Sequence, residues 1–361
     1  MRLTLFAALA VTTAVALQAP PGQAADFSPH VKRVLETYIR PATQAFAETS
    51  ATLPPAAEAL CSAPSDQTRE AFAASYTKTL EALGNITFLR FGPLISDHRL
   101  ERLAFLPDAR NIAQRQIRKA LTDQDGTLGD PAALAGKSVA LQGLTALQLI
   151  AFDSDSNLTL GAGDDKEALC AYASAITRNV ASIAGEIAAE WQDPKGYSAL
   201  LLTADAGNDQ FHSSKEAIET IFNAQVTGLI VIKDQELLPA LGTGKDKAKP
   251  NKLPFSRSSN ASAYMAAELE GIRDAMNAAK FEPNLGSDAA WIPGSLNFEF
   301  GNAAKTLRSL KGPLRQTMDA GATYDKLNLV AIQVNSLRDT MALNLAGGLG
   351  LSGGFNALDG D

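Results

Sequence analysis

The sequence predicts an all-α protein of two helical-bundle domains, and a duplicated four-helix bundle would fit the same pattern. Nearly every long segment repeats its apolar residues with a helical rather than an alternating period, and its Ala, Leu, Glu and Gln favour helices. The 361 residues exceed what one hydrophobic core usually organises. Helix breakers gather at 192–196, after the longest predicted helix. We therefore expect an N-terminal bundle at 25–193 and a C-terminal bundle at 197–345.

The first bundle is divided by capping residues and prolines. Pro41 should bend the first helix, Ser65 is a helix cap, and Asp130 followed by Pro131 opens another helix. The helices that this pattern predicts are 27–52, 65–83, 109–121, 137–152 and 165–191.

The second bundle begins with a capping box. Ser213 and Glu216 have the required spacing and lead into a helix that reaches about residue 238. The Lys-rich segment 245–252 has no interleaved aromatic residues, so we interpret it as a solvated loop. Further helices are predicted at 262–280, 301–319 and 324–345, before a Gly-rich tail at 346–361 that should fray. Two apolar segments that contain Gly, 141–150 and 225–232, look alike, as a duplication would require.

Composition limits the chemistry. With 32 basic and 39 acidic residues the net charge is −7, which disfavours nucleic acid as a partner. The chain has only three His and two Cys, so few imidazole or thiolate ligands are available. Any site must depend mainly on oxygen ligands and Arg.

The N-terminus has the features of a secretory leader. Arg2 precedes an uncharged run from Leu3 to Leu17, and small residues allow cleavage after Ala24. The run is shorter than the ~20 residues that span a bilayer, and no later segment approaches that length. We predict a signal peptide at 1–24 and a periplasmic or secreted mature chain without a transmembrane segment.

Both cysteines lie in the mature chain, where an oxidising compartment favours a disulfide between Cys61 and Cys170. By the chain-entropy relation such a long loop is worth about 4 to 5 kcal/mol. A metal-binding or nucleophilic Cys is the alternative, but neither Cys has a His at ligand spacing.

Segment 88–110 packs charged residues among large apolar ones. It contains four Arg and two Asp, and two interpretations stay open: ion pairs that lock a loop to the bundle, or an anion site. Arg257 and Ser258, before a predicted helix, could face the same cleft from the second bundle. The side chains that define this tract are Arg90, Arg99, Arg102, Asp108 and Arg110.

Taken together, the segments resemble the imelysin-like family of exported bacterial proteins. The resemblance depends on the order and spacing of many short motifs along the mature chain. These are Ile39-Arg-Pro-Ala42, Leu60-Cys61, Leu89-Arg-Phe-Gly-Pro93, Arg99-Leu-Glu-Arg102, Phe105-Leu-Pro-Asp-Ala-Arg110, Val139-Ala-Leu-Gln-Gly143, Leu169-Cys-Ala-Tyr172, Val226-Thr-Gly-Leu229, Lys233-Asp-Gln235 and Ser256-Arg-Ser258.

The resemblance implies two helical-bundle domains, a site at their interface, an association with bacterial iron uptake, and a grouping with a peptidase. The family motif is Gly-x-His-x-x-Glu on a helix, where His and Glu share a face and could hold a metal. The matching stretch keeps Gly143 but has Thr145 and Gln148 in place of the His and the Glu. A hydroxyl and an amide bind transition metals weakly and are poor bases, which disfavours metalloprotease chemistry. Thr145 and Gln148 are then either ordinary polar helix residues or a remodelled site.

The three histidines do not replace the motif. His98 and Glu101 match His-x-x-Glu by spacing, but the preceding Gly is missing, so we expect an exposed His there. His30 and His212 are also expected to face solvent.

The functional expectation is a non-catalytic binding or accessory component of iron uptake, with its site between the bundles. The residues proposed for the site are Gly143, Thr145, Gln148, Arg102, Asp108, Arg110, Arg257 and Ser258. No cofactor is assigned, and iron or an iron-chelate anion is the candidate ligand. Partners would be that small ligand or membrane-associated iron-uptake components, and not nucleic acid. Two alternatives stay open: a hydrolase in which Asp108 and Glu101 act as acid and base, and a purely structural bundle.

Overall fold

The computed structural model describes residues 25–318 and 321–352. The expected signal peptide at 1–24, and the part of the expected tail from residue 353 on, lie outside the described residues. The all-α prediction is confirmed: in the described ranges the chain forms helices and no β-strand, apart from one isolated bridge between Phe152 and Leu158.

Ten α-helices lie in the N-terminal half, from residue 25 on. The helices are α1 (Ser28–Val34), α2 (Arg40–Ser50), α3 (Leu53–Ser62), α4 (Asp66–Gly84), α5 (Arg99–Leu103), α6 (Ile112–Thr122), α7 (Pro131–Ala135), α8 (Gly143–Ala151), α9 (Lys166–Gln192) and α10 (Tyr197–Leu202). A π-helical turn, Leu35–Ile39, joins α1 to α2, so the chain stays helical through Pro41 and the irregular turn lies just before the proline.

The C-terminal half contains the remaining seven. The helices are α11 (Ser214–Ile230), α12 (Leu238–Leu241), α13 (Ala261–Ala279), α14 (Ile292–Arg308), α15 (Leu314–Thr317), α16 (Ala322–Asp339) and α17 (Ala346–Leu349). Two π-helical stretches, Val231–Leu237 and Thr340–Leu345, continue α11 into α12 and α16 into α17.

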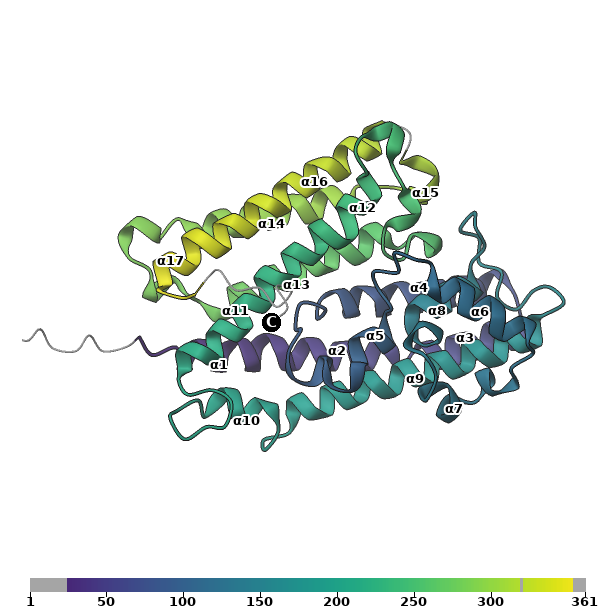
Figure 1. Cartoon of the computed structure of the whole chain (residues 1–361), viewed down its shortest axis with the longest axis horizontal. Helices are drawn as coiled ribbons and strands as arrows, with labels where there is room; N and C mark the ends of the chain where they lie inside the picture. Colours follow the sequence, from purple (N-terminus) through teal and green to yellow (C-terminus); the bar gives the residue numbers. More distant parts are fainter. Residues whose placement is uncertain (1–24, 319–320, 353–361) are drawn as a thin grey trace, which may run out of the picture.

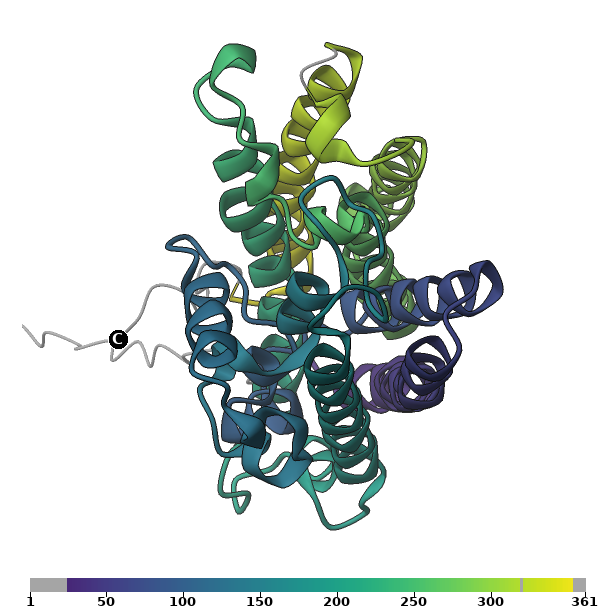
Figure 2. The same cartoon turned by 90° about the vertical axis from the view of Figure 1, so that its right-hand side faces the viewer.

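The two halves lie one above the other in Figure 1, and Figure 2 shows the same separation from the side. In the lower half, α9 packs on α2, α3 and α8, and in the upper half α14 packs on α13 and α16. Helix α4 of the lower half packs along α13 of the upper half, and α1 also contacts α11 and α13. One hydrophobic cluster therefore extends through both halves. The division into 25–193 and 197–345 stays a prediction.

Local capping signals are confirmed. The Ser65 hydroxyl accepts from the Thr68 amide at 3.2 Å, and the Asp130 carboxylate accepts from the Ala132 amide at 3.0 Å. The Ser213 hydroxyl accepts from the Glu216 amide at 3.2 Å. The carboxylate of Glu216 accepts from the His212 amide at 2.8 Å, so its reciprocal bond reaches one residue further back than a standard capping box.

Several predicted helix boundaries differ from the structure. The predicted helix 137–152 divides at Gly143, whose φ of +72° is not helical, leaving a short 3₁₀ turn before α8. The predicted helix 301–319 begins earlier, at Ile292, because Leu296 and Phe300 are fully buried and extend the apolar face past Gly301. It also ends earlier, at Arg308, and the short helix α15 follows it. Residues 346–349, assigned to the tail, form α17 because Ala346 and Leu349 are buried.

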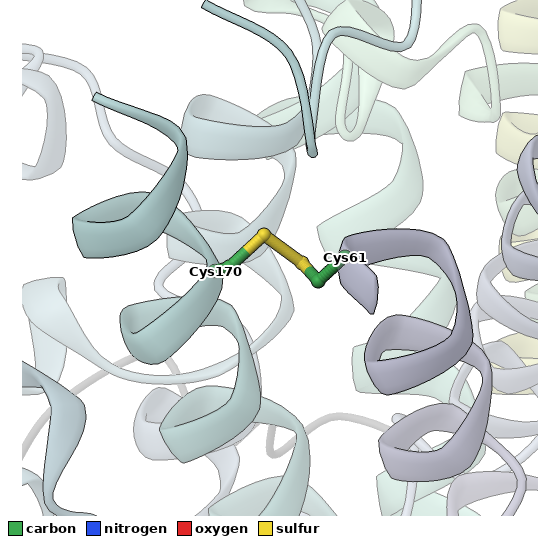
Figure 3. Close-up of a disulfide and its surroundings, with 2 residues drawn as sticks. All are labelled: Cys61 and Cys170. Atoms are coloured by element: carbon green, nitrogen blue, oxygen red, sulfur yellow. A yellow bond between two sulfur atoms is a disulfide. The ribbon is translucent and has the colours of Figure 1, made fainter. Parts of the chain in front are cut away.

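The predicted disulfide is present. Cys61 lies near the end of α3 and Cys170 in α9, and the sulfurs are bonded with the Cα atoms 5.8 Å apart (Figure 3). The bond fastens α3 to the longest helix of the lower half. None of the helices within the described ranges is both long and apolar enough to cross a membrane.

Candidate functional site

A cavity of about 610 Å³ lies between the two halves. The N-terminal half contributes Thr87 and Arg90 from the segment after α4, the segment from α5 to α6, and α8. The C-terminal half contributes the π-helical stretch after α11, the loop 249–257, and single residues of α13 and α15. The sequence-predicted residues that line it are Asp108, Thr145, Gln148 and Arg257.

Thr145 and Gln148 lie on one face of α8 and line the cavity. Their side chains are 4% and 6% exposed. The Thr145 hydroxyl and the Gln148 carbonyl oxygen have no hydrogen-bond partner among the described residues. Buried polar atoms are usually paired, because an unpaired one loses its water without compensation. The Thr145 hydroxyl and the Gln148 carbonyl oxygen are therefore unpaired polar atoms of two residues that line the cavity.

Gly143 does not line the cavity, and its role is in the backbone. Besides its positive φ, a Cβ atom there would clash with the carbonyl oxygens of Arg102 and Leu103. The start of α8 is held by two phenols: Tyr172 donates to the Leu141 carbonyl at 2.6 Å, and Tyr76 to the Leu144 carbonyl at 2.9 Å. The glycine thus permits the packing that orients Thr145 and Gln148.

Three further predicted site residues, Arg102, Arg110 and Ser258, do not line the cavity, and a role for them in the site stays a prediction. Arg102 donates to Gln142 Oε1 at 3.2 Å and to Asn179 Oδ1 at 3.4 Å, which joins α5 to α9. The side chain of Arg110 is exposed. The hydroxyl of Ser258 donates to the Phe255 carbonyl at 3.0 Å and closes a local turn.

Asp108 lines the cavity, but both of its oxygens have partners. Oδ1 accepts from the Ile112 amide at 2.7 Å and Oδ2 accepts from the Ala113 amide at 2.9 Å. These are free amides of the first turn of α6, so the carboxylate caps that helix. This bonding favours a structural role over that of a general base.

Arg99 supports the interpretation of the charged tract as a lock. Its guanidinium lies 2.6 Å from Glu190 and 3.3 Å from Glu186, both on α9, and donates to the Pro93 carbonyl at 3.0 Å. The Arg99 side chain is 7% exposed. Hydrogen bonding to Glu190 raises the pKa of this Arg, so the ion pair is retained.

Arg257 faces the cavity from the C-terminal half. Burial, followed by the like charge of Arg315, lowers its pKa, while Asp153 raises it. The Arg257 charge is therefore incompletely balanced by its surroundings.

Sequence reasoning missed a buried carboxyl pair beside the cavity. Glu236 and Glu268 are 5% and 4% exposed, and they interact directly although they come from different helices. Burial raises the pKa of Glu268 to about 7 and raises that of Glu236 well above its usual range. Thr87 donates to Glu268 Oε1 at 3.0 Å. The available signal was Glu268, a carboxyl group inside the otherwise apolar run from Tyr264 to Leu269 of α13.

The histidines lie outside the cavity. His98 and His212 are exposed, as expected. His30 is 3% exposed, so its assignment to the surface was wrong: its Nδ1 lies 2.8 Å from the Ala279 carbonyl and fastens α1 to the end of α13. No group of three or more His, Cys, Asp or Glu that could hold a metal occurs in the described part of the chain.

The fold and its cavity define a class of protein: an all-α chain of two helical halves with a ligand-sized space between them. The chain belongs to the Imelysin family, whose model matches residues 34–343.

Solved structures share the fold. A crystal structure of an imelysin-like protein from Psychrobacter arcticum 273-4 aligns with a TM-score of 0.75 at 19% identity, covering 91% of this chain and 97% of that one. A putative iron-regulated protein A precursor from Parabacteroides distasonis ATCC 8503 aligns with a TM-score of 0.63 at 11% identity, covering 90% and 96%. No curated protein matches.

Proposed function

We propose that this protein is a non-catalytic binding or accessory component of bacterial iron uptake, exported to the periplasm or the exterior. Its site is the cavity between the two halves. The observation that carries the proposal is the pair of unpartnered polar atoms on Thr145 and Gln148, buried in that cavity. The iron association is supported by membership of the Imelysin family and by the name of the Parabacteroides relative. The partners would be a small ligand and membrane-associated iron-uptake components.

The chemistry of the cavity supports binding rather than catalysis. Thr145 and Gln148 are neutral at physiological pH and neither is a strong base. Asp108, the carboxylate that the sequence assigned to the site and that lines the cavity, is engaged by two helix amides. A cavity with free hydrogen-bonding groups and without an activated nucleophile is suited to recognition.

Binding titrations test the proposal. The purified protein is titrated by calorimetry with Fe²⁺, Fe³⁺, Zn²⁺ and ferric citrate, beside the variant Thr145→Ala/Gln148→Ala. The control variant Thr37→Ala/Gln44→Ala changes the same residue types at exposed positions of the π-helical turn Leu35–Ile39 and of α2. We expect an iron species to bind the parent and the control, and to bind the cavity variant at least about tenfold more weakly. Tight binding of a bare ion that survives Thr145→Ala/Gln148→Ala would contradict the site. No binding or thermal shift with any iron species would favour a purely structural bundle.

A hydrolase of the imelysin type is the second candidate, and the Glu236–Glu268 pair favours it. A carboxyl group with a pKa near 7 can serve as a general acid or base at neutral pH. Cleavage of casein or of a peptide library by the parent, lost in Glu236→Gln or in Asp108→Asn, would support this candidate. Absence of cleavage in a preparation that binds an iron species would support the binding role.

A further inference from the structure

One wall of the cavity is cationic. Four basic side chains from the C-terminal half line it, and within the described ranges none of the four pairs with a carboxylate. The ion pairs of the neighbouring segments use other lysines, Lys233 with Asp234 and Lys247 with Asp246. The four cavity residues are Lys249, Lys252, Arg257 and Arg315.

The acidic residues of the cavity do not neutralise this wall. Asp108 is turned to the amides of α6. Asp234 is paired with Lys233. Glu236 is buried beside Glu268, which favours its protonated form. The cavity therefore has an excess of positive charge.

Arg257 and Arg315 show the excess most clearly. Arg257 is only partly exposed, and Arg315 is close enough for their charges to repel. Both guanidinium groups donate to main-chain carbonyls of the N-terminal half, Arg257 to Phe152 at 2.6 Å and Arg315 to Ser154 at 3.4 Å. Carbonyl oxygens orient the groups but do not neutralise them. An anion placed between the two guanidinium groups would neutralise them, because guanidinium groups bind carboxylates strongly.

The opposite wall needs hydrogen-bond donors instead. Gln148 Oε1 is a buried acceptor without a partner, and the Thr145 hydroxyl can accept or donate. A ligand with carboxylates alone would leave the Gln148 oxygen unpaired, whereas a ligand hydroxyl would satisfy it.

The size of the cavity points to an organic molecule. About 610 Å³ is far more than one metal ion occupies and lies within the range of small-molecule sites.

We propose that the cavity binds a hydroxy-polycarboxylate, with the carboxylates against the cationic wall and the hydroxyl donating to Gln148. This ligand class rests on the proposed function in taking the cavity as the binding site. Its oxygen atoms are also the kind that hold hard metal ions, so free and metal-chelated forms share the recognition chemistry.

A matched pair of ligands tests the hydroxyl. Citrate and tricarballylate carry the same three carboxylates, and only citrate has the hydroxyl. By calorimetry on the purified protein we expect citrate to bind about tenfold more tightly than tricarballylate, and this preference to disappear in Gln148→Leu. Equal affinities in the parent protein, or a preference that survives Gln148→Leu, would overturn the assignment. Inorganic phosphate is the third ligand, and tighter binding of phosphate than of citrate would overturn the carboxylate class.

Charge variants test the cationic wall. Lys249→Gln/Arg315→Gln should weaken citrate binding by about tenfold or more and reduce its dependence on salt. Lys247→Gln is the control, because this exposed lysine belongs to the same loop and does not line the cavity. Citrate binding that is unchanged in the double variant, or no citrate binding by the parent, would overturn the proposal.

Titrations with iron ions, with and without citrate, distinguish a failure of this inference from a failure of the proposed function. Tight binding of Fe²⁺ or Fe³⁺ without citrate, unchanged in Lys249→Gln/Arg315→Gln, would retain an iron role and overturn the ligand class. Citrate binding that iron does not strengthen, together with no binding of iron ions, would retain the ligand class and overturn the iron role.

Discussion

Arg257 donates a hydrogen bond of 2.6 Å to the carbonyl oxygen of Phe152, the residue that directly follows α8. The bond joins the C-terminal half to the helix that carries Thr145 and Gln148. Lys252 makes a similar contact from the same loop, donating to the Ala109 carbonyl at 2.9 Å. Side chains of one half thus reach main-chain carbonyls of the other at the cavity, and this sets the distance between its walls.

Gly143→Ala should destabilise the protein strongly. The added Cβ would clash with two main-chain carbonyls at a positive φ, and neither neighbour is a flexible side-chain end. We expect a loss of about 2 to 4 kcal/mol in the free energy of unfolding, measured by urea denaturation.

Gly185→Ala is the matched control. Gly185 is an exposed residue inside α9 with open space around its Cα, so alanine should stabilise the protein by about 0.5 to 1 kcal/mol. Equal effects of the two substitutions would show that Gly143 has no special packing role.

Sequence prediction succeeded where the interacting residues are close in the sequence and failed where they are far apart in it. Ser65 and Asp130 were predicted correctly as caps because capping depends on amides two or three residues away. Arg102 and Asp108 lie in one charged tract, yet only Asp108 lines the cavity, since contact with Asn179 turns Arg102 towards α9. Composition and spacing in the tract do not determine that direction.

The Glu236–Glu268 pair could not be predicted from the sequence for a related reason. Glu236 and Glu268 are 32 positions apart and meet only because α13 packs near the π-helical stretch after α11. Thr145 and Gln148 were found because a family motif marks their positions, and the structure adds that both face a cavity without partners.

Removal of the disulfide should lower stability without changing the fold. Cys61 and Cys170 close a loop with a sequence separation of 109, and such loops restrict the unfolded chain most. We expect Cys61→Ala/Cys170→Ala to lose about 2 to 4 kcal/mol in urea denaturation. Reductant should destabilise the parent by a similar amount and leave the double variant unchanged. A parent protein whose urea midpoint does not respond to reductant would argue against the bond in solution.

The Glu236–Glu268 pair should make stability fall as pH rises. Because the folded-state pKa of Glu268 is raised to about 7, the folded protein retains a proton that the unfolded chain releases near its usual value of 4.5. The stabilisation by that proton is complete below about pH 4.5 and is lost as the pH rises through 7. Glu268→Gln keeps a neutral side chain at every pH. It should therefore gain up to about 3 kcal/mol relative to the parent between pH 5 and pH 8.

Urea denaturation at several pH values measures this effect. Arg90, Thr87 and Tyr264 face Glu268 beside Glu236, and all four residues are the same in the parent and in the variant. Glu282→Gln, at an exposed position, is the control and should follow the parent at each pH. Parallel curves for the parent and Glu268→Gln would contradict the raised pKa.

Restoring the two family residues should create a metal site. In Thr145→His/Gln148→Glu, an imidazole and a carboxylate replace a hydroxyl and an amide at positions three apart on α8, and both would face the cavity. We expect the double variant to bind Zn²⁺ at least about tenfold more tightly than the parent, with each single variant intermediate, by calorimetry. The binding should weaken below about pH 6, because the imidazole must lose its proton to bind the metal. Zn²⁺ affinity equal to that of the parent would show that these two positions do not converge on one ion, and that the substitutions in this chain did not remove a metal site.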